Sequence, residues 1–188
     1  MGIVVDPVLA RESDSRGLVV PALLSRAVDY GLIFGASAGI QIISASAFGV
    51  PSADWFADTS PLLSLWAVLT MSVPMWTYNS VLVAAPRTGT VGQRVTRVRV
   101  VTDSGEPLVF GHSILRTAIL FAGWEISHIA MFIPRNIATD QPALWQYVGV
   151  SLGTLYLVSD LVAIVATGGR KSLADLLMGT RLVSTRTP

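Results

Sequence analysis

Apolar residues form four long blocks along this chain, and polar residues gather between them. Residues 30–53 and 59–86 contain no charged residue, residues 117–134 contain only Glu125, and residues 141–169 contain only Asp160. A helix that crosses a bilayer needs about 20 mainly apolar residues. The pattern therefore predicts four transmembrane helices, which fall at about 27–49, 62–84, 114–133 and 145–167.

Composition supports the same class of protein. The 188 residues are 52% hydrophobic and 13% charged, and the charged share is about half of that in soluble domains. The sequence thus predicts an all-α membrane protein built as a four-helix bundle. The alternative, a soluble protein with very apolar core helices, would need a polar outer face that the rest of the chain does not supply. A net charge of +1 gives no nucleic-acid footprint.

The distribution of basic residues predicts the orientation. With a cytoplasmic N-terminus, all of the 13 Lys and Arg residues except Arg135 lie on the inner side, as the positive-inside rule requires. Both termini are then cytoplasmic, and Trp66 and Trp145 begin their helices at the outer interface. Residues 1–20 carry acidic groups rather than a basic signal-peptide start. We expect them to form a mobile cytoplasmic tail, followed by a transmembrane domain over 21–188.

Two cytoplasmic segments carry their own signals. In the loop 86–112, arginine and valine alternate over residues 97–100 and lead into a turn at Asp103-Ser104-Gly105, which predicts a β-hairpin. In the segment 168–188, Ser172 can cap a short interfacial helix that Gly179 ends, and the following "TRLVS" could add a strand to the hairpin. The loop is also basic, and we expect its arginines to meet anionic lipid headgroups, with a dedicated partner site as the alternative. The candidates are Arg94, Arg97, Arg99 and Arg116.

Three ionisable residues fall inside the predicted spans, where charge is costly and side chains usually face the bundle interior. At 1.5 Å per residue, Asp160 lies about 10 Å from the cytoplasmic edge, Glu125 about 13–14 Å and His128 about 18 Å. Asp160 shares a helical face with Gly149 and Gly153, a small-residue stripe that indicates close helix packing. These three residues are candidate proton- or cation-binding groups. Alternatively, Glu125 and His128 hydrogen-bond each other and only hold helices together.

Several motifs together resemble the RDD family of bacterial membrane proteins. They comprise Arg26 and Asp29 at the first span, Thr90 and Gly92 in the loop, Arg99, Val100 and Val101 before a turn at Asp103 and Gly105, Arg116, and "DLLMGTRLV" from Asp175 to Val183. The resemblance covers about residues 20–185. It makes Arg26, Asp29 and Asp175 the signature residues and implies a multi-pass protein of the bacterial plasma membrane. This chain departs from the family pattern with Gln93 in place of Lys and Ala174 in place of His.

The signature residues also allow a purely structural interpretation. Arg26 and Asp29 stand three residues apart and could pair locally at the headgroups, and Asp175 could pair with Arg26 or Arg94. Functionally, the resemblance and the staggered Asp160, Glu125 and His128 favour a small transporter or ion-coupled permease, expected to be a homo-oligomer because four helices make a thin wall. The alternative is a non-transporting scaffold or accessory subunit for a partner membrane protein.

Catalysis and cofactors are not indicated. The chain has no Cys and two His, and a single E-x-x-H sequence is half of what a di-iron bundle requires. No nucleophile–base pair stands at a suitable depth. We therefore expect no enzyme activity, no metal site and no cofactor.

Overall fold

The computed structural model describes residues 17–51, 61–85, 89–132 and 142–185. The long helices are α1 (Val19–Phe48), α6 (Phe110–Phe132) and α7 (Leu144–Ala166). Between α1 and α6 the chain forms α3 (Pro61–Ala67), the π-helix η2 (Val68–Ser72), α4 (Val73–Ala84), the short α5 (Val91–Thr96) and the strand β1 (Val98–Thr102). After α7 come α8 (Leu173–Met178) and β2 (Thr180–Ser184).

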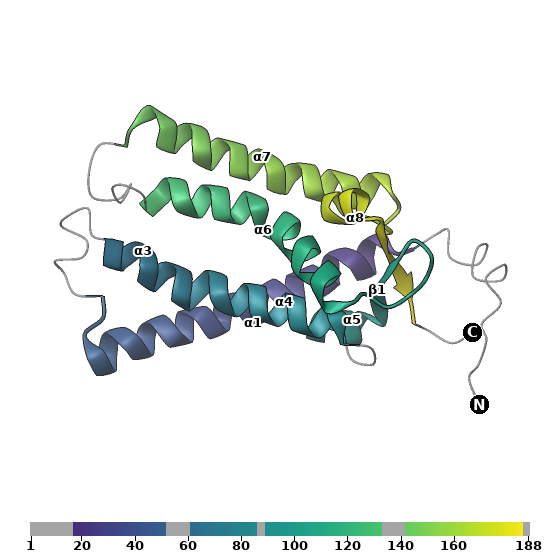
Figure 1. Ribbon diagram of the computed structural model, residues 1–188, viewed down its shortest axis with the longest axis horizontal. Coiled ribbons are helices and arrows are strands. Elements are labelled where there is room, and N and C mark those ends of the chain that lie inside the picture. Colours follow the sequence, from purple (N-terminus) through teal and green to yellow (C-terminus); the bar gives the residue numbers. More distant parts are fainter. Residues whose placement is uncertain (1–16, 52–60, 86–88, 133–141, 186–188) are drawn as a thin grey trace.

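The helices lie lengthwise beside one another, and the small elements gather at one end (Figure 1). We call the end formed by α5, α8, β1 and β2 the cap end and the opposite end the far end. The mainly helical prediction is confirmed. In the described residues, α1, α6 and α7 are each long and apolar enough to cross a membrane. The first predicted span began at residue 27, whereas α1 begins at Val19.

The second predicted span is a continuous α–π–α segment rather than one regular helix. α3 passes directly into η2 and then into α4, which carries Pro74 at its start. Pro74 lacks an N–H and cannot make the regular i→i−4 bond. The residue before it, Val73, donates its N–H to the Val68 carbonyl, five residues back. The π turn thus lies directly before the start of α4, where Pro74 stands.

α6 and α7 form the closest helix pair, and glycines allow the approach. A Cβ atom on Gly153 would lie 2.3 Å from the Gly123 carbonyl oxygen and 2.1 Å from Ser127 Oγ. A Cβ on Gly149 would lie 2.5 Å from that of Ala130. The small-residue stripe predicted for α7 is therefore a true packing face. The stripe of Gly31, Gly35 and Gly39 on α1 instead meets open space.

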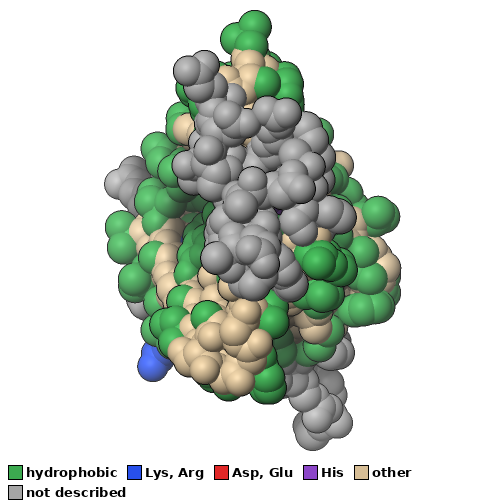
Figure 2. Space-filling model, turned by 90° about the vertical axis from the view of Figure 1, so that its left-hand side faces the viewer, with side chains coloured by type: hydrophobic (Ala, Val, Ile, Leu, Met, Phe, Trp, Pro, Cys, Tyr) green, Lys and Arg blue, Asp and Glu red, His purple; other side chains and the backbone are tan. Residues whose placement is uncertain are grey.

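Most of the outer helix surface is apolar. Leu152, Leu155 and Val162 on α7 are each more than half exposed, and the described side chains seen from the far end are mostly hydrophobic or uncharged (Figure 2). The packed interior includes Ile33, Met75, Leu120 and Phe121. An apolar exterior around a partly polar interior is the arrangement that lipid favours.

The cap contains a two-stranded antiparallel sheet in which Val98 pairs with Ser184 and Thr102 with Thr180. The prediction of a local hairpin was wrong, because the partner of β1 is the C-terminal strand rather than the residues after the turn. The turn itself is present, since the Gly105 N–H donates to the Thr102 carbonyl. The added strand "TRLVS" and the short helix between Ser172 and Gly179 are confirmed.

Candidate functional site

Arg26 joins α1 to α7 at the cap end. Its guanidinium donates to the Asp160 carboxylate, and the other Asp160 oxygen accepts from the Leu173 N–H at 2.8 Å. One buried carboxylate thereby links α1, α7 and the start of α8. The expectation that Asp160 faces the interior is confirmed, but local pairing of Arg26 with Asp29 was wrong, because the partner of Arg26 lies on another helix.

Asp175 and Arg116 form a second buried ion pair. Arg116 Nε lies 2.7 Å from Asp175 Oδ1, and Thr180 and Ser172 also donate to this carboxylate at 2.6 and 2.7 Å. Burial alone would raise the pKa of Asp175, but the Arg116 charge and these hydrogen bonds outweigh it and hold that pKa well below its usual range. The pairing expected with Arg26 or Arg94 was wrong. Arg116 is 5% exposed and so does not face headgroups.

Asp29 holds the short helix α5 against α1. One carboxylate oxygen accepts from Thr90 Oγ1 at 2.7 Å, and the other accepts from the Gly92 N–H at 2.8 Å and the Tyr78 hydroxyl at 2.6 Å. Thr90 and Gly92, the two loop residues of the predicted family motif, therefore both bind Asp29. Gln93 completes a capping box with Thr90.

The remaining basic residues lie on the outside of the cap. Arg94 and Arg97 are exposed, and Arg99 in β1 is partly exposed. Arg97 ends α5 in the left-handed conformation, with φ of 57°. Contact of these three residues with anionic headgroups stays a prediction. Residues 86–88 of the basic loop lie outside the described part of the chain, as do residues 1–16 of the N-terminal tail.

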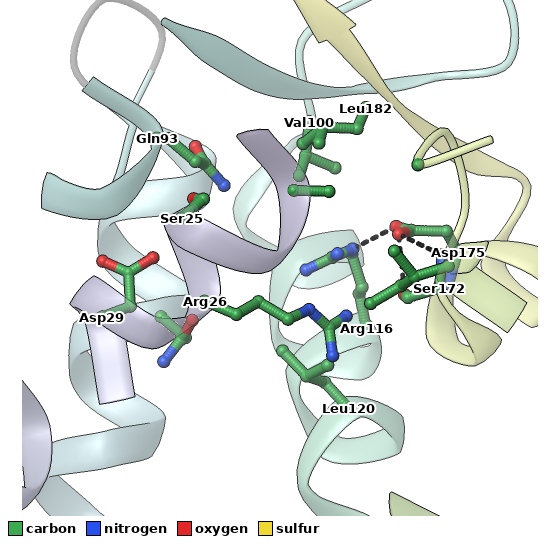
Figure 3. A pocket seen from close by; sticks show the side chains of 14 residues that line it. Ser25, Arg26, Asp29, Gln93, Val100, Arg116, Leu120, Ser172, Asp175 and Leu182 are labelled. Carbon is green, nitrogen blue, oxygen red and sulfur yellow. Dashed lines mark hydrogen bonds and ion pairs between the residues drawn. The ribbon is translucent and has the colours of Figure 1, made fainter. Parts of the chain in front are cut away.

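A cavity of about 50 Å³ lies at the cap end and is lined by Arg26, Asp29, Arg116 and Asp175. Figure 3 shows the Arg26 and Arg116 side chains extending into it from two helices, with Asp175 and Ser172 on one side and Asp29 on the other. A buried water needs at least about 10–15 Å³ of such space. The cavity can thus hold a few waters among charged groups, and it is too small for an organic substrate.

Glu125 and His128 form a second polar cluster deeper in the bundle. Ser72 Oγ in η2 donates to Glu125 Oε2 at 3.0 Å and lies 3.4 Å from His128 Nδ1. Trp76 Nε1 in α4 donates to Glu125 Oε1 at 3.0 Å. The hydrogen bonds described for Glu125 thus come from η2 and α4, so the expectation that it bonds directly to His128 is replaced by a bridge through Ser72. Ser72 and Trp76 were missed by the sequence reasoning.

Apolar side chains separate the two polar regions. Leu120 lines the cavity and also belongs to the core with Ile33, Met75 and Phe121. Along α6, Leu120 and Phe121 come between Arg116 and Glu125. Along α4, Met75 comes between Ser72 and Asn79, which lines the cavity. A layer of hydrophobic side chains therefore lies between the deeper cluster and the cap-end cavity.

Comparison with known proteins gives a match to one protein family. No curated protein and no solved structure matches it. The model of the RDD family matches residues 22–179, a range that begins four residues before Arg26 and ends at Gly179, which closes α8. With three apolar helices long enough to cross a membrane, the chain has the features of an integral membrane protein, and it belongs to the RDD family.

Proposed function

We propose that this protein is a small transporter of the bacterial plasma membrane that couples to protons or small cations at Glu125 and His128. The observation that carries the proposal is a carboxylate held inside an apolar bundle by neutral donors. Glu125 accepts from the Ser72 hydroxyl and the Trp76 indole N–H. Ionisable residues at membrane depth are costly, and they mark ion pathways and proton relays. A group of this kind can gain and lose a proton during transport.

The fold supports a multi-pass arrangement with the cap end in the cytoplasm. The segment from Pro61 to Ala84 is about 35 Å long at 1.5 Å per residue, which is enough for a fourth span of a core about 30 Å thick. It returns the chain to the cap end, where α5 and β1 follow. The first described residues of α1 and the strand β2 lie at that same end (Figure 1).

The described conformation corresponds to a state closed toward the cap. The layer of Ile33, Met75, Leu120 and Phe121 separates Glu125 from the cavity. The Arg26–Asp160 and Arg116–Asp175 pairs tie α1, α6, α7 and α8 together at the same end. Transport would require these ties to loosen so that Glu125 reaches the cytoplasmic side, since a site must be open to each side in turn.

Glu125→Gln is expected to remove most proton or sodium flux. In liposomes carrying an imposed gradient, the unchanged protein should dissipate that gradient faster than empty vesicles do. The amide cannot bind and release a proton but keeps a similar size and can still accept hydrogen bonds. Glu106→Gln is the matched control, because Glu106 is exposed in the turn after β1. Equal rates for protein-containing and empty vesicles would refute transport.

A second candidate is a non-transporting scaffold or accessory subunit. The glycine stripe of Gly31, Gly35 and Gly39 favours it, because open space lies before each of these positions and such stripes allow close helix association in membranes. The same surface would equally serve a homo-oligomeric transporter. A partner that co-purifies from native membranes, together with unaltered function of Glu125→Gln in cells, would favour the scaffold.

A further inference from the structure

We infer that the ion handled at this site is the proton, and that the Ser72 hydroxyl passes it between His128 and Glu125. The inference deepens the proposed function and rests on it for its role in transport. The hydrogen-bond chain itself does not depend on the proposed function and can be measured without transport.

The donor and acceptor capacity of the three groups fixes the direction of each hydrogen bond. An ionised carboxylate only accepts, and a hydroxyl has a single proton to donate. Ser72 gives that proton to Glu125 Oε2 at 3.0 Å. Its oxygen can then only accept from His128 Nδ1 at 3.4 Å, so Nδ1 carries a proton whenever Glu125 is ionised. At 3.4 Å this link is the longer of the two, and catalytic hydrogen bonds are often long in structures without bound substrate.

The hydrogen-bond chain from His128 through Ser72 to Glu125 has a second arrangement, which it reaches after taking up one proton. When His128 takes up a proton at Nε2, its Nδ1 proton moves to Ser72 Oγ while the Ser72 proton moves to Glu125 Oε2. The histidinium becomes neutral imidazole protonated at Nε2, the serine hydroxyl is restored, and the carboxylate becomes a neutral acid. No charge remains on the three groups, and the tautomer of His128 reports the protonation of Glu125.

The surroundings favour a proton over a metal cation. Cations such as Ca²⁺ and Mg²⁺ require six or more oxygen ligands, whereas here an indole N–H points at Glu125 Oε1. In the described residues, no group of three or more His, Cys, Asp or Glu side chains is placed to hold a metal ion. At this level α7 presents Gly149 and Gly153 to α6, and the ring of Trp124 lies against His128 with centroids 5.6 Å apart.

The π turn gives Ser72 its position. Ser72 is the last residue of η2 and is 5% exposed. π turns inside α-helices are rare and occur often at functional sites. Insertion of one residue rotates the following helix relative to the preceding one, so a serine at this point can reach α6 while Trp76, one turn later, reaches the same carboxylate.

The test uses the full-length protein with ¹⁵N-labelled histidine, reconstituted in bilayers and in proton-flux liposomes. In the unchanged protein at a pH where Glu125 is ionised, His128 should be protonated at Nδ1, and acidification should move the proton to Nε2. Ser72→Ala should abolish this tautomer switch and lower proton flux by about 100-fold, the lower limit for a positioned proton-transfer group. Ser72→Thr, which keeps the hydroxyl, should restore both.

Ser37→Ala is the matched control, because Ser37 is also buried and its hydroxyl makes no hydrogen bond within the described chain. It should change neither the tautomer nor the flux. A Ser72→Ala protein with the normal tautomer switch would overturn the relay even if transport is observed. A correct tautomer switch without flux in the unchanged protein would instead support the relay and refute the proposed transport function.

Discussion

Arg116→Ala is expected to lower the free energy of unfolding by about 3–5 kcal/mol, the usual cost of removing one partner of a buried ion pair. Arg116 and Asp175 are 5% and 4% exposed, and Arg116 Nε lies 2.7 Å from Asp175 Oδ1. Alanine would leave the carboxylate buried without its charged partner, with hydrogen bonds from the Ser172 N–H, the Ser172 hydroxyl and the Thr180 hydroxyl. Reversible unfolding in mixed micelles, followed by circular dichroism, measures the difference.

The control for this prediction is the exposed ion pair of Lys171 and Asp103. Its side chains are 27% and 48% exposed, with Nζ 2.7 Å from Oδ1. Surface pairs contribute about 0–1 kcal/mol, so Lys171→Ala should leave the unfolding curve nearly unchanged. A loss for Lys171→Ala as large as that for Arg116→Ala would show that burial does not distinguish the two pairs.

Gly92→Ala is the second large effect, because α5 lies directly on α1. A Cβ atom at position 92 would lie 2.0 Å from the Ser25 carbonyl oxygen and 2.8 Å from the Asp29 carboxylate. The Ser25 oxygen belongs to the α1 backbone, so α5 must move away and the Gly92 N–H must leave Asp29. Overpacking of this kind costs about 1–3 kcal/mol, and the loss of the Asp29 hydrogen bonds adds to it.

The measurement for Gly92→Ala is the unfolding free energy together with the trypsin cleavage rate after Arg94, which should rise as α5 detaches. Gly111→Ala in the first turn of α6 is the control, because no atom lies within 4 Å of its added Cβ. Alanine there should be neutral or stabilising by up to about 1 kcal/mol. Equal behaviour of the two variants would contradict the close packing of α5 on α1.

Features determined within one segment could be predicted from the sequence. The apolar blocks located the helices, and the Ser172 and Gly179 signals located both ends of α8. The spacing of Gly149, Gly153 and Asp160 identified the packed face of α7, because these residues share one helical surface. In each case the pattern and its cause lie within a few helical turns.

Most features that depend on pairing between distant segments could not be predicted. Arg26 and Asp29 are close in sequence, but Asp160 competes for Arg26 from a helix 134 residues away. The predicted local hairpin partner of β1 was wrong, but the strand "TRLVS" that does pair with β1 was predicted from its own residues. Ser72 was missed because a serine in an apolar helix carries no periodic signal, and its contact with Glu125 depends on the π turn.

The central claim is that a bundle of four membrane-spanning segments places Glu125 within the bilayer. The chain has no Cys, so single cysteines at Phe48, Glu106 and Ala143 can be labelled without background. An impermeant maleimide should label Phe48→Cys and Ala143→Cys from outside intact cells, and Glu106→Cys only in inverted membrane vesicles. Labelling of Phe48→Cys and Glu106→Cys from the same side would contradict the account, because the segment between them would then not cross the membrane.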